Sequence, residues 1–222
     1  MAIDFNKLHG GAKKSEVKYM KLADGDNTFR ILPQSILPNF TYWVTGANKK
    51  DLPFEALQFD RDLETFDNSR PCPVRDMGIK NDKGEDLRCQ WAYKCQVINK
   101  ATGNIEVLQL KKGIMNDTIS VAQDLGIDPT CTETGTWLTV NRKKTGPLAY
   151  NVEYTVRQLK CKSSPLGDDD LALIAESKTM EELFPLETYA EQSARIEKHL
   201  SGAKEAAPAP SDDAEAIDEL ED

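Results

Sequence analysis

The sequence is poor in the residues that catalytic and metal centres use. Its 222 residues include two histidines, His9 and His199, near opposite ends of the chain. No phosphate-binding loop, serine-hydrolase motif or zinc-peptidase motif occurs. The cysteines are odd in number and irregularly spaced without a Cys-x-x-Cys pair, which favours reduced thiols over disulfides or zinc ligands. They are Cys72, Cys89, Cys95, Cys131 and Cys161. We therefore predict no catalytic activity, no cofactor and no metal.

Long hydrophobic runs are also missing. The chain has no stretch of about 18 apolar residues, the length that a membrane-spanning helix requires. Its start, Met-Ala-Ile-Asp-Phe-Asn-Lys, lacks the basic region and apolar run of a secretory signal. We expect a soluble cytoplasmic protein with no membrane partner. A body of roughly 160 residues is long enough to bury its own core.

Acidic residues are concentrated at the C-terminal end. Residues 1–162 carry 24 basic and 20 acidic side chains, whereas residues 203–222 carry one and eight. The sequence pI near 4.9 therefore hides a mildly basic body. A basic body with an acidic tail is expected of a polyanion-binding protein that carries its own competitor.

The first part of the body has strand patterns. Residues 17–22 and 28–32 are predicted to pair as a hairpin around Asp24-Gly25-Asp26-Asn27, with Pro33 ending the second strand. Residues 34–86 show no sustained period and contain several prolines and aromatics. Because long structureless loops are uncommon in compact domains, we interpret this stretch as an insertion with short strands or turns.

The second part has the clearest alternation of apolar and polar residues, at 87–97, with a predicted return strand at 105–110. A helix is expected at 116–125, ended by Gly126. Residues 136–140 and 148–156 predict another hairpin around the basic turn 141–147.

The C-terminal part changes to helical patterns. Helices are predicted at 169–177, capped by Asp168, at 180–184, opened by the capping box Thr179-x-x-Glu182, and at 186–200. Too little apolar surface follows to support a fold. The chain is thus divided into a flexible leader (1–15), a β domain (16–162, with the insertion 34–86), a helical extension (163–202) and a disordered acidic tail (203–222).

Aromatic and basic side chains occur close together along the β domain. Trp91 and Tyr93 lie between Arg88 and Lys94, and Tyr150 and Tyr154 follow the basic turn. Single-strand binders need stacking faces, worth roughly 1–3 kcal/mol per base, and cations along the backbone. These aromatics also occupy the apolar faces of their strands, so each is a candidate for the core as well as for the ligand surface.

Several segments in order resemble the T4-type phage single-stranded DNA-binding proteins. Val17-Lys-Tyr-Met-Lys-Leu22, a glycine turn and Arg30-Ile-Leu-Pro33 are similar to the first hairpin of that family. The resemblance continues through Cys72-Pro-Val74, Trp91-Ala92 before a lysine-containing turn, the segment 107–119 with Lys111-Lys112, and Gly135, a strand, a basic turn and Tyr150-Asn151. It implies a mainly β, OB-fold-like barrel with an insertion, a trough lined by aromatic and basic side chains, and an acidic tail that recruits replication proteins.

The sequence departs from this family at two places. The zinc subdomain of the family uses one His and three Cys, but here only Cys72 matches and Arg75 stands three residues later. We infer that zinc is lost and that aromatic side chains stabilise the insertion. The basic N-terminal arm through which the family binds cooperatively is reduced to Lys13-Lys14.

On these grounds we expect binding of single-stranded DNA without sequence specificity, which protects the strand during phage replication, recombination and repair. The expected DNA-binding residues are Arg30, Trp43, Lys49, Lys50, Arg88, Trp91, Tyr93, Lys94, Lys111, Lys112, Arg142, Lys143, Lys144 and Tyr150. The tail is expected to compete for the DNA surface and to recruit phage or host replication and recombination proteins. Its expected partner-binding residues are Asp212, Asp213, Glu215, Ile217, Asp218, Glu219, Leu220, Glu221 and Asp222.

Two alternatives stay open at this point. An acidic protein-interaction scaffold with a solubilising tail would give no mobility shift with an oligonucleotide. An RNA-binding OB protein would be separated by competition between DNA and RNA, because no residue of the chain visibly recognises a 2′-hydroxyl.

Overall fold

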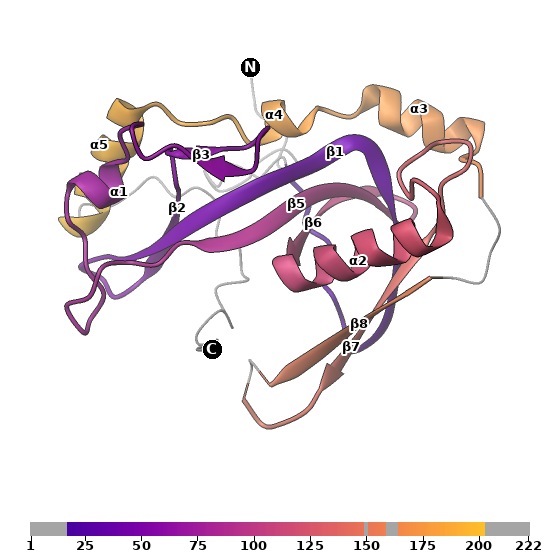
Figure 1. Ribbon diagram of the computed structural model, residues 1–222, viewed down its shortest axis with the longest axis horizontal. Helices are drawn as coiled ribbons and strands as arrows, with labels where there is room; N and C mark the ends of the chain where they lie inside the picture. Colours follow the sequence, from indigo (N-terminus) through magenta and orange to yellow (C-terminus); the bar gives the residue numbers. More distant parts are fainter. Residues whose placement is uncertain (1–16, 149–150, 159–163, 203–222) are drawn as a thin grey trace, which may run out of the picture.

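The computed structural model describes residues 17–148, 151–158 and 164–202 (Figure 1). Its main feature is a six-stranded antiparallel sheet in the order β6-β5-β1-β7-β8, with β2 also paired to β1. A separate two-stranded sheet joins β3 and β4. The strands are β1 (Gly25–Thr45), β2 (Asp51–Glu55), β3 (Phe59–Asp60), β4 (Thr65–Phe66), β5 (Gln90–Asn99), β6 (Ile105–Lys111), β7 (Leu138–Lys144) and β8 (Val152–Gln158). The helices are α1 (Pro73–Asp76), α2 (Lys112–Leu125), α3 (Asp168–Glu176), α4 (Met180–Leu183) and α5 (Tyr189–Leu200).

The connectivity of the sheet is OB-like. The long central strand β1 pairs with β5 on one side and with β7 on the other, and β5–β6 and β7–β8 are hairpins. Helix α2 connects the two hairpins and packs against β5, β6 and β8. Five strands with a helix between the third and the fourth form the arrangement of an OB fold, so the fold is mainly β and OB-like.

Strand β1 is longer than the sequence predicts. Pro33 does not end it, because the pairing of β1 with β5 shifts between Ile31 and Ile36, and Pro33 lies in this irregularity. A bulge needs no ladder hydrogen bond from proline. The hydroxyl of Ser35 donates to the carbonyls of Leu32 (2.7 Å) and Gln96 (3.1 Å) and stabilises the bend. The first residues of the predicted insertion therefore belong to the central strand.

The predicted first hairpin is wrong. Tyr19 forms an isolated parallel bridge with Val107 at the edge of β6 instead of pairing with β1. The N–H of Met20 donates to the carbonyl of Val107 (2.9 Å). The side-chain amide of Asn27 binds the carbonyls of Ala23 (2.8 Å) and Val140 (3.2 Å), so the turn is tied to β7. A local turn signal predicted the bend, but long-range hydrogen bonds set the strand partner.

Three hydrophobic clusters form the core, and the smallest joins Leu32 of β1 and Ile98 of β5 to Leu166. The first lies inside the barrel, where Tyr93, Cys95 and Val97 of β5 are buried as the alternation predicts, although the strand begins at Gln90 rather than at residue 87. The second supports residues 46–89, which we call the β1–β5 lobe because they connect these two strands. Phe54 and Phe59 of the lobe are 0% and 2% exposed, in agreement with the expected stabilisation by aromatic side chains.

The helices after the sheet are predicted well. The capping box of α4 forms, with the backbone N–H of Thr179 donating to Glu182 Oε2 (2.8 Å). Helix α3 is capped by Gly167 rather than Asp168, and α5 begins after a second capping box at Thr188 that we did not predict.

Helix α2, which lies between β6 and β7, begins at Lys112 and ends, as expected, at Gly126 in the left-handed conformation. None of the helices in the described ranges is long and apolar enough to span a membrane.

Helix α5 is packed against the β1–β5 lobe. Ile196 is fully buried in the second cluster, and Gln192 Nε2 donates to the carbonyl of Glu55 (2.9 Å). The buried ring of His199 is bonded through Nε2 to the carbonyl of Val44 (2.8 Å). His199 is therefore a packing residue, and Gly46 must leave room for it.

The close approach at Gly46 gives a testable prediction. A Cβ at this position would lie 2.6 Å from Nε2 and 2.7 Å from Nδ1 of the His199 ring, which is buried and hydrogen-bonded. We expect Gly46→Ala to lower the free energy of unfolding by about 1–3 kcal/mol, measured by denaturant titration. Gly113→Ala is the matched control, because a Cβ there meets open space. Equal stability of the two variants would contradict this packing.

Candidate nucleic-acid interface

The start of α2 places two lysines over two aromatic rings. Strand β6 ends at Lys111 and α2 begins at Lys112, so the chain turns sharply between them. Lys112 Nζ lies 3.8 Å from the centroid of the Trp91 ring, and Lys111 Nζ lies 5.7 Å from that of Tyr154. Both distances are typical of cation–π contacts. These contacts connect β5 and β8 through the first residues of α2.

Trp91 packs against both the first and the second cluster of the core. Its ring centroid is 4.9 Å from that of Phe40 and 5.8 Å from that of Tyr93. The ring is only partly buried, and Lys112 lies over it. The Nε1 atom of Trp91 is buried without a hydrogen-bond partner in the described part of the chain. Trp91 is thus half core residue and half candidate stacking face.

Tyr93 does not share this exposure. It is 4% exposed and belongs to the barrel core. Its hydroxyl donates to Glu64 Oε2 (3.3 Å), and burial raises the pKa of Tyr93 to about 12. Tyr93 packs beside Trp91 and, in contrast to the prediction made for it, has no free ring face in this conformation.

The basic residues 142–144 lie in β7, not in a turn. Pairing continues through Arg142↔Tyr154 to Lys144↔Val152, and the hairpin turn comes later. Since side chains alternate along a strand, Arg142 and Lys144 share a face with Tyr154, and Lys143 lies on the other. Lys143 and Lys144 are exposed, and Arg142 forms an ion pair with Asp24. Tyr150 falls outside the described residues.

We call the contiguous set Trp91, Lys111, Lys112, Arg142, Lys144 and Tyr154 the cationic face. Figure 1 shows α2 between the β5–β6 pair and the β7–β8 hairpin, the elements that supply these side chains. Tyr154 was recognised from the sequence only as an aromatic near the basic segment. Its place beneath Lys111 depends on the packing of α2 against β8.

The backbone adds to the positive field at this face. Helix α2 has neither a side-chain cap at Lys111 nor an acidic residue in its first turn. Its first N–H groups therefore carry the positive end of the helix dipole without compensation from the helix itself. Gly113 has no side chain to cover this backbone, and an added Cβ there would have no atom within 4 Å.

Arg30 lies away from this face. Its side chain is 0% exposed, and its guanidinium donates to the carbonyls of Ser164 (3.3 Å) and Cys131. Burial lowers the pKa of Arg30 from its usual value. Gly135 leaves the space for it, since a Cβ there would lie 2.6 Å from the carbonyl of Pro129 and closer still to the guanidinium. Arg30 therefore has a structural role in the fold, and its buried guanidinium is not available for the expected contact with phosphate in this conformation.

Lys94 is also withdrawn from solvent. Its Nζ lies 4.3 Å from the ring centroid of Phe184, at the end of α4. Burial lowers the pKa of Lys94, and the nearby carboxylate of Glu55 partly opposes this effect. Its position beneath Phe184 does not suit a contact with DNA.

The other expected residues are not part of the cationic face. The indole N–H of Trp43 donates to Gln90 Oε1 (3.1 Å), and the ring is partly buried. Lys49 and Lys50 are exposed at the tip of the β1–β2 hairpin, near α5. Arg88 is exposed just before β5. Their contact with DNA stays a prediction, and it would require the bound strand to extend beyond the cationic face.

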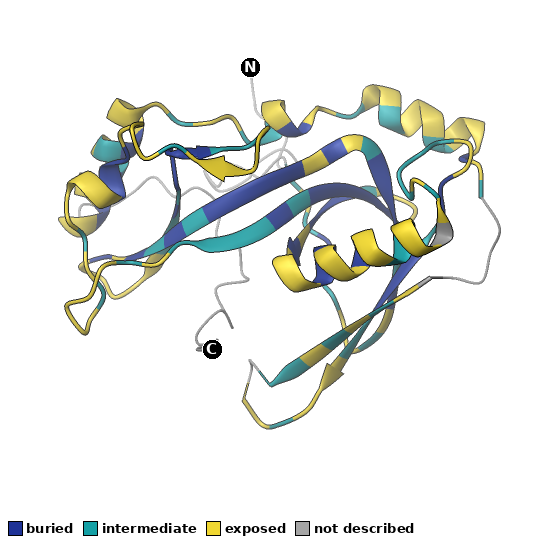
Figure 2. Cartoon of the chain, viewed as in Figure 1, coloured by how far each residue is buried: buried dark blue, intermediate teal, exposed yellow. Residues whose placement is uncertain are grey.

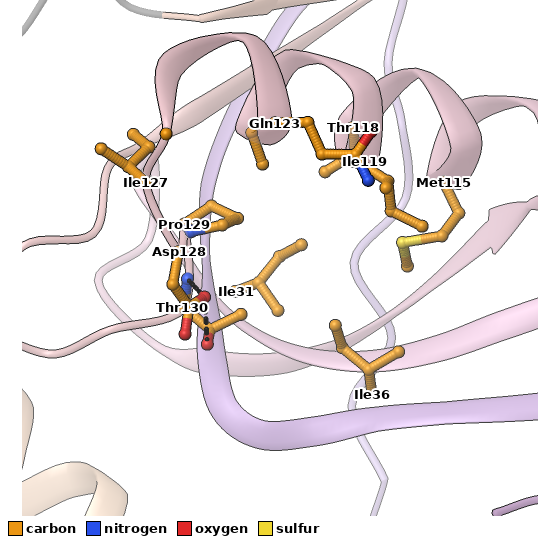
Figure 3. A pocket seen from close by; sticks show the side chains of 12 residues that line it. Ile31, Ile36, Met115, Thr118, Ile119, Gln123, Ile127, Asp128, Pro129 and Thr130 are labelled. Atoms are coloured by element: carbon orange, nitrogen blue, oxygen red, sulfur yellow. Dashed lines mark hydrogen bonds between the residues drawn. The ribbon is translucent and has the colours of Figure 1, made fainter.

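A pocket of about 370 Å³ lies on another side of α2 (Figure 3). It is lined mainly by apolar side chains from α2, the bend of β1 and the loop after α2, including Ile31, Ile36 and Ile119. No cationic or aromatic side chain lines it. Its chemistry does not suit nucleic acid.

Within the described ranges, no group of three or more His, Cys, Asp or Glu side chains could hold a metal ion. Cys72 and Cys89 are free thiols in the β1–β5 lobe.

Comparison with known proteins found one informative similarity. No protein-family model matches the chain. Over 234 residues, 91% of this chain and 88% of the relative, the sequence is 22% identical to a protein of Escherichia phage T5 named "Probable ssDNA-binding protein".

Proposed function

We propose that this protein binds single-stranded DNA without sequence specificity and has no catalytic activity. The observation that carries the proposal is the pair of lysines over Trp91 and Tyr154 at the start of α2. Aromatic faces for bases and cations for phosphates are the two elements of single-strand binding.

The cation–π contacts suggest how binding proceeds. In the free protein, each ammonium group occupies a ring face that a base would need. A base that stacks on Trp91 or Tyr154 displaces the lysine, which then binds the adjacent phosphate. The aromatic ring then stacks on a base, and the ammonium group pairs with a phosphate. Neither contact involves a base edge, so binding is independent of sequence.

The position of the site in the fold supports this proposal. OB folds bind oligonucleotides on the face of their second and third strands. In this protein these strands are β5 and β6, which supply Trp91 and Lys111. The name of the phage T5 relative agrees with the same ligand.

Tryptophan fluorescence during titration with poly-dT over a salt series tests the function. We expect quenching in wild type that is largely lost in Trp91→Phe. The logarithm of the affinity should fall by roughly 0.7 per phosphate contact for each decade of salt. Poly-U as competitor separates DNA from RNA. Affinity without salt dependence, or tighter binding to duplex DNA, would refute the proposal.

We propose a second role for the acidic residues 203–222, which lie outside the described residues. Their carboxylates compete with DNA for the cationic face, and Ile217 and Leu220 then serve as anchors for replication and recombination proteins. With both roles, the protein would protect single-stranded DNA during phage replication, recombination and repair.

Deletion of residues 206–222 tests the competition. It should tighten binding to oligo-dT at low salt and have less effect at high salt, because screening already weakens the competition there. Replacing the same carboxylates by amides at constant length is the matched control for chain length. Unchanged affinity at low salt in both variants would refute the autoinhibitory role and leave recruitment to be tested separately.

A further inference from the structure

The turn between β3 and β4 exposes the side chain of Leu63 to an unusual degree. Leu63 is 72% exposed, and Phe66 at the end of the hairpin is 41% exposed. Residues 62–66, which form most of the turn and β4, are exposed (Figure 2). We call residues 59–66 the knob. Large apolar side chains exposed on one short hairpin can form a patch of the kind that marks interaction sites.

Several contacts hold the knob in one conformation. Asp60 Oδ1 accepts the backbone N–H groups of Asp62 and Leu63, both at 3.0 Å. Arg61 forms a two-point contact with Glu55 (2.6 and 2.8 Å) and donates to the carbonyl of Phe184 (3.1 Å). Leu63 is thus presented by an ordered turn, which lowers the entropy cost of a contact made there.

The base of the knob packs against aromatic rings of β1 and β3. The Phe66 ring lies 4.7 Å from Phe40 and 5.4 Å from Phe59, centroid to centroid. Glu64 accepts the hydroxyl of Tyr93. Since Phe40 also contacts Trp91, the knob lies at the edge of the cationic face.

The charge of the knob indicates which ligand suits it. Asp62 and Glu64 flank Leu63, and among the described residues no cation forms an ion pair with either carboxylate. Phosphates beside Leu63 would meet these two negative charges. A protein surface with lysine or arginine around an apolar patch would instead be attracted to them.

We propose that the knob is a docking site for an amphipathic, cationic segment of another protein. Leu63 and Phe66 provide the apolar anchor, and Asp62 and Glu64 pair with the lysines or arginines at its rim. This site is separate from the acidic C-terminal residues. It would hold a partner next to the strand bound on the cationic face.

A labelled synthetic peptide tests the proposal on the full-length protein. The peptide consists of leucine and lysine with all leucines on one helical face, and its scrambled version is the control. Fluorescence anisotropy should show tighter binding of the first peptide than of the scrambled one. Leu63→Ser and Asp62→Lys should each weaken this binding on the order of tenfold. Leu173→Ser should not, although Leu173 is 41% exposed and its helix begins with three aspartates.

The outcomes separate this proposal from DNA binding. Leu63→Ser should keep the thermal stability and the oligo-dT affinity of wild type. The proposal is overturned if Leu63→Ser and Leu173→Ser behave alike, or if the scrambled peptide binds equally well. It is also overturned if Leu63→Ser loses oligo-dT affinity with peptide binding intact, or if it only abolishes self-association in sedimentation. If wild type binds the peptide but not oligo-dT, and Leu63→Ser loses the peptide, the proposed DNA-binding function is refuted. The docking site at the knob is then still supported.

Discussion

Reversing the charges of Lys111 and Lys112 together is expected to lower the affinity for oligo-dT on the order of 100-fold at low salt. Both ammonium groups lie at the start of α2, where the backbone adds positive potential and the first turn of the helix carries no acidic side chain. In the proposed mechanism each exchanges an aromatic ring for a phosphate. In the double variant the strand loses two phosphate contacts and meets two negative charges in their place.

The salt dependence distinguishes a lost contact from a general change of charge. Removal of two contacts should reduce the slope of log K against log salt by roughly 1.4. The matched control reverses Lys83 and Lys198, which are exposed on the β1–β5 lobe and on α5. It changes the net charge equally and should retain most of the affinity. A comparable loss in both double variants would show that net charge, and not the cationic face, controls binding.

Arg30→Met is expected to produce the largest loss of stability among substitutions of the basic residues in the expected DNA-binding set. The guanidinium is fully buried and donates to carbonyls of two segments that are distant in the sequence, at Cys131 and Ser164. Methionine fills much of the volume but supplies no donor, so these carbonyls lose a partner. We expect the free energy of unfolding to fall by about 2–4 kcal/mol, measured by denaturant titration.

Arg88→Met is the control for Arg30→Met, because Arg88 is exposed. The oligo-dT affinity of Arg30→Met, measured where the protein is still folded, should equal that of wild type. A variant that is as stable as wild type but binds oligo-dT tenfold more weakly would restore Arg30 to the DNA site.

Local signals in the sequence were sufficient for several elements. The alternation in β5 identifies Tyr93, Cys95 and Val97 as core residues, because one face of a strand packs on the barrel. Gly126 ends α2, since glycine adopts the left-handed conformation at little cost. Thr179 opens α4 through a capping box. Each signal depends on residues within a few positions of one another.

The errors concern features that depend on distant partners. Pro33 was expected to end a strand, but the shift in pairing with β5 leaves it inside β1. Residues 142–144 were expected in a turn, but pairing with β8 extends β7 through them. In both cases the hydrogen bonds come from a strand that the local sequence does not specify.

By itself, the sequence determined the mainly β character, the positions of most helices, the separation of charge along the chain and the pairing of aromatic with basic residues. Only the tertiary structure decided which of these residues are exposed at the surface. Arg30 and Lys94 are cations whose surroundings withdraw them from solvent, whereas Lys111 and Lys112 are exposed over aromatic rings. The physical reason is that burial depends on which distant segments cover a side chain, and a residue's type and near neighbours do not specify them.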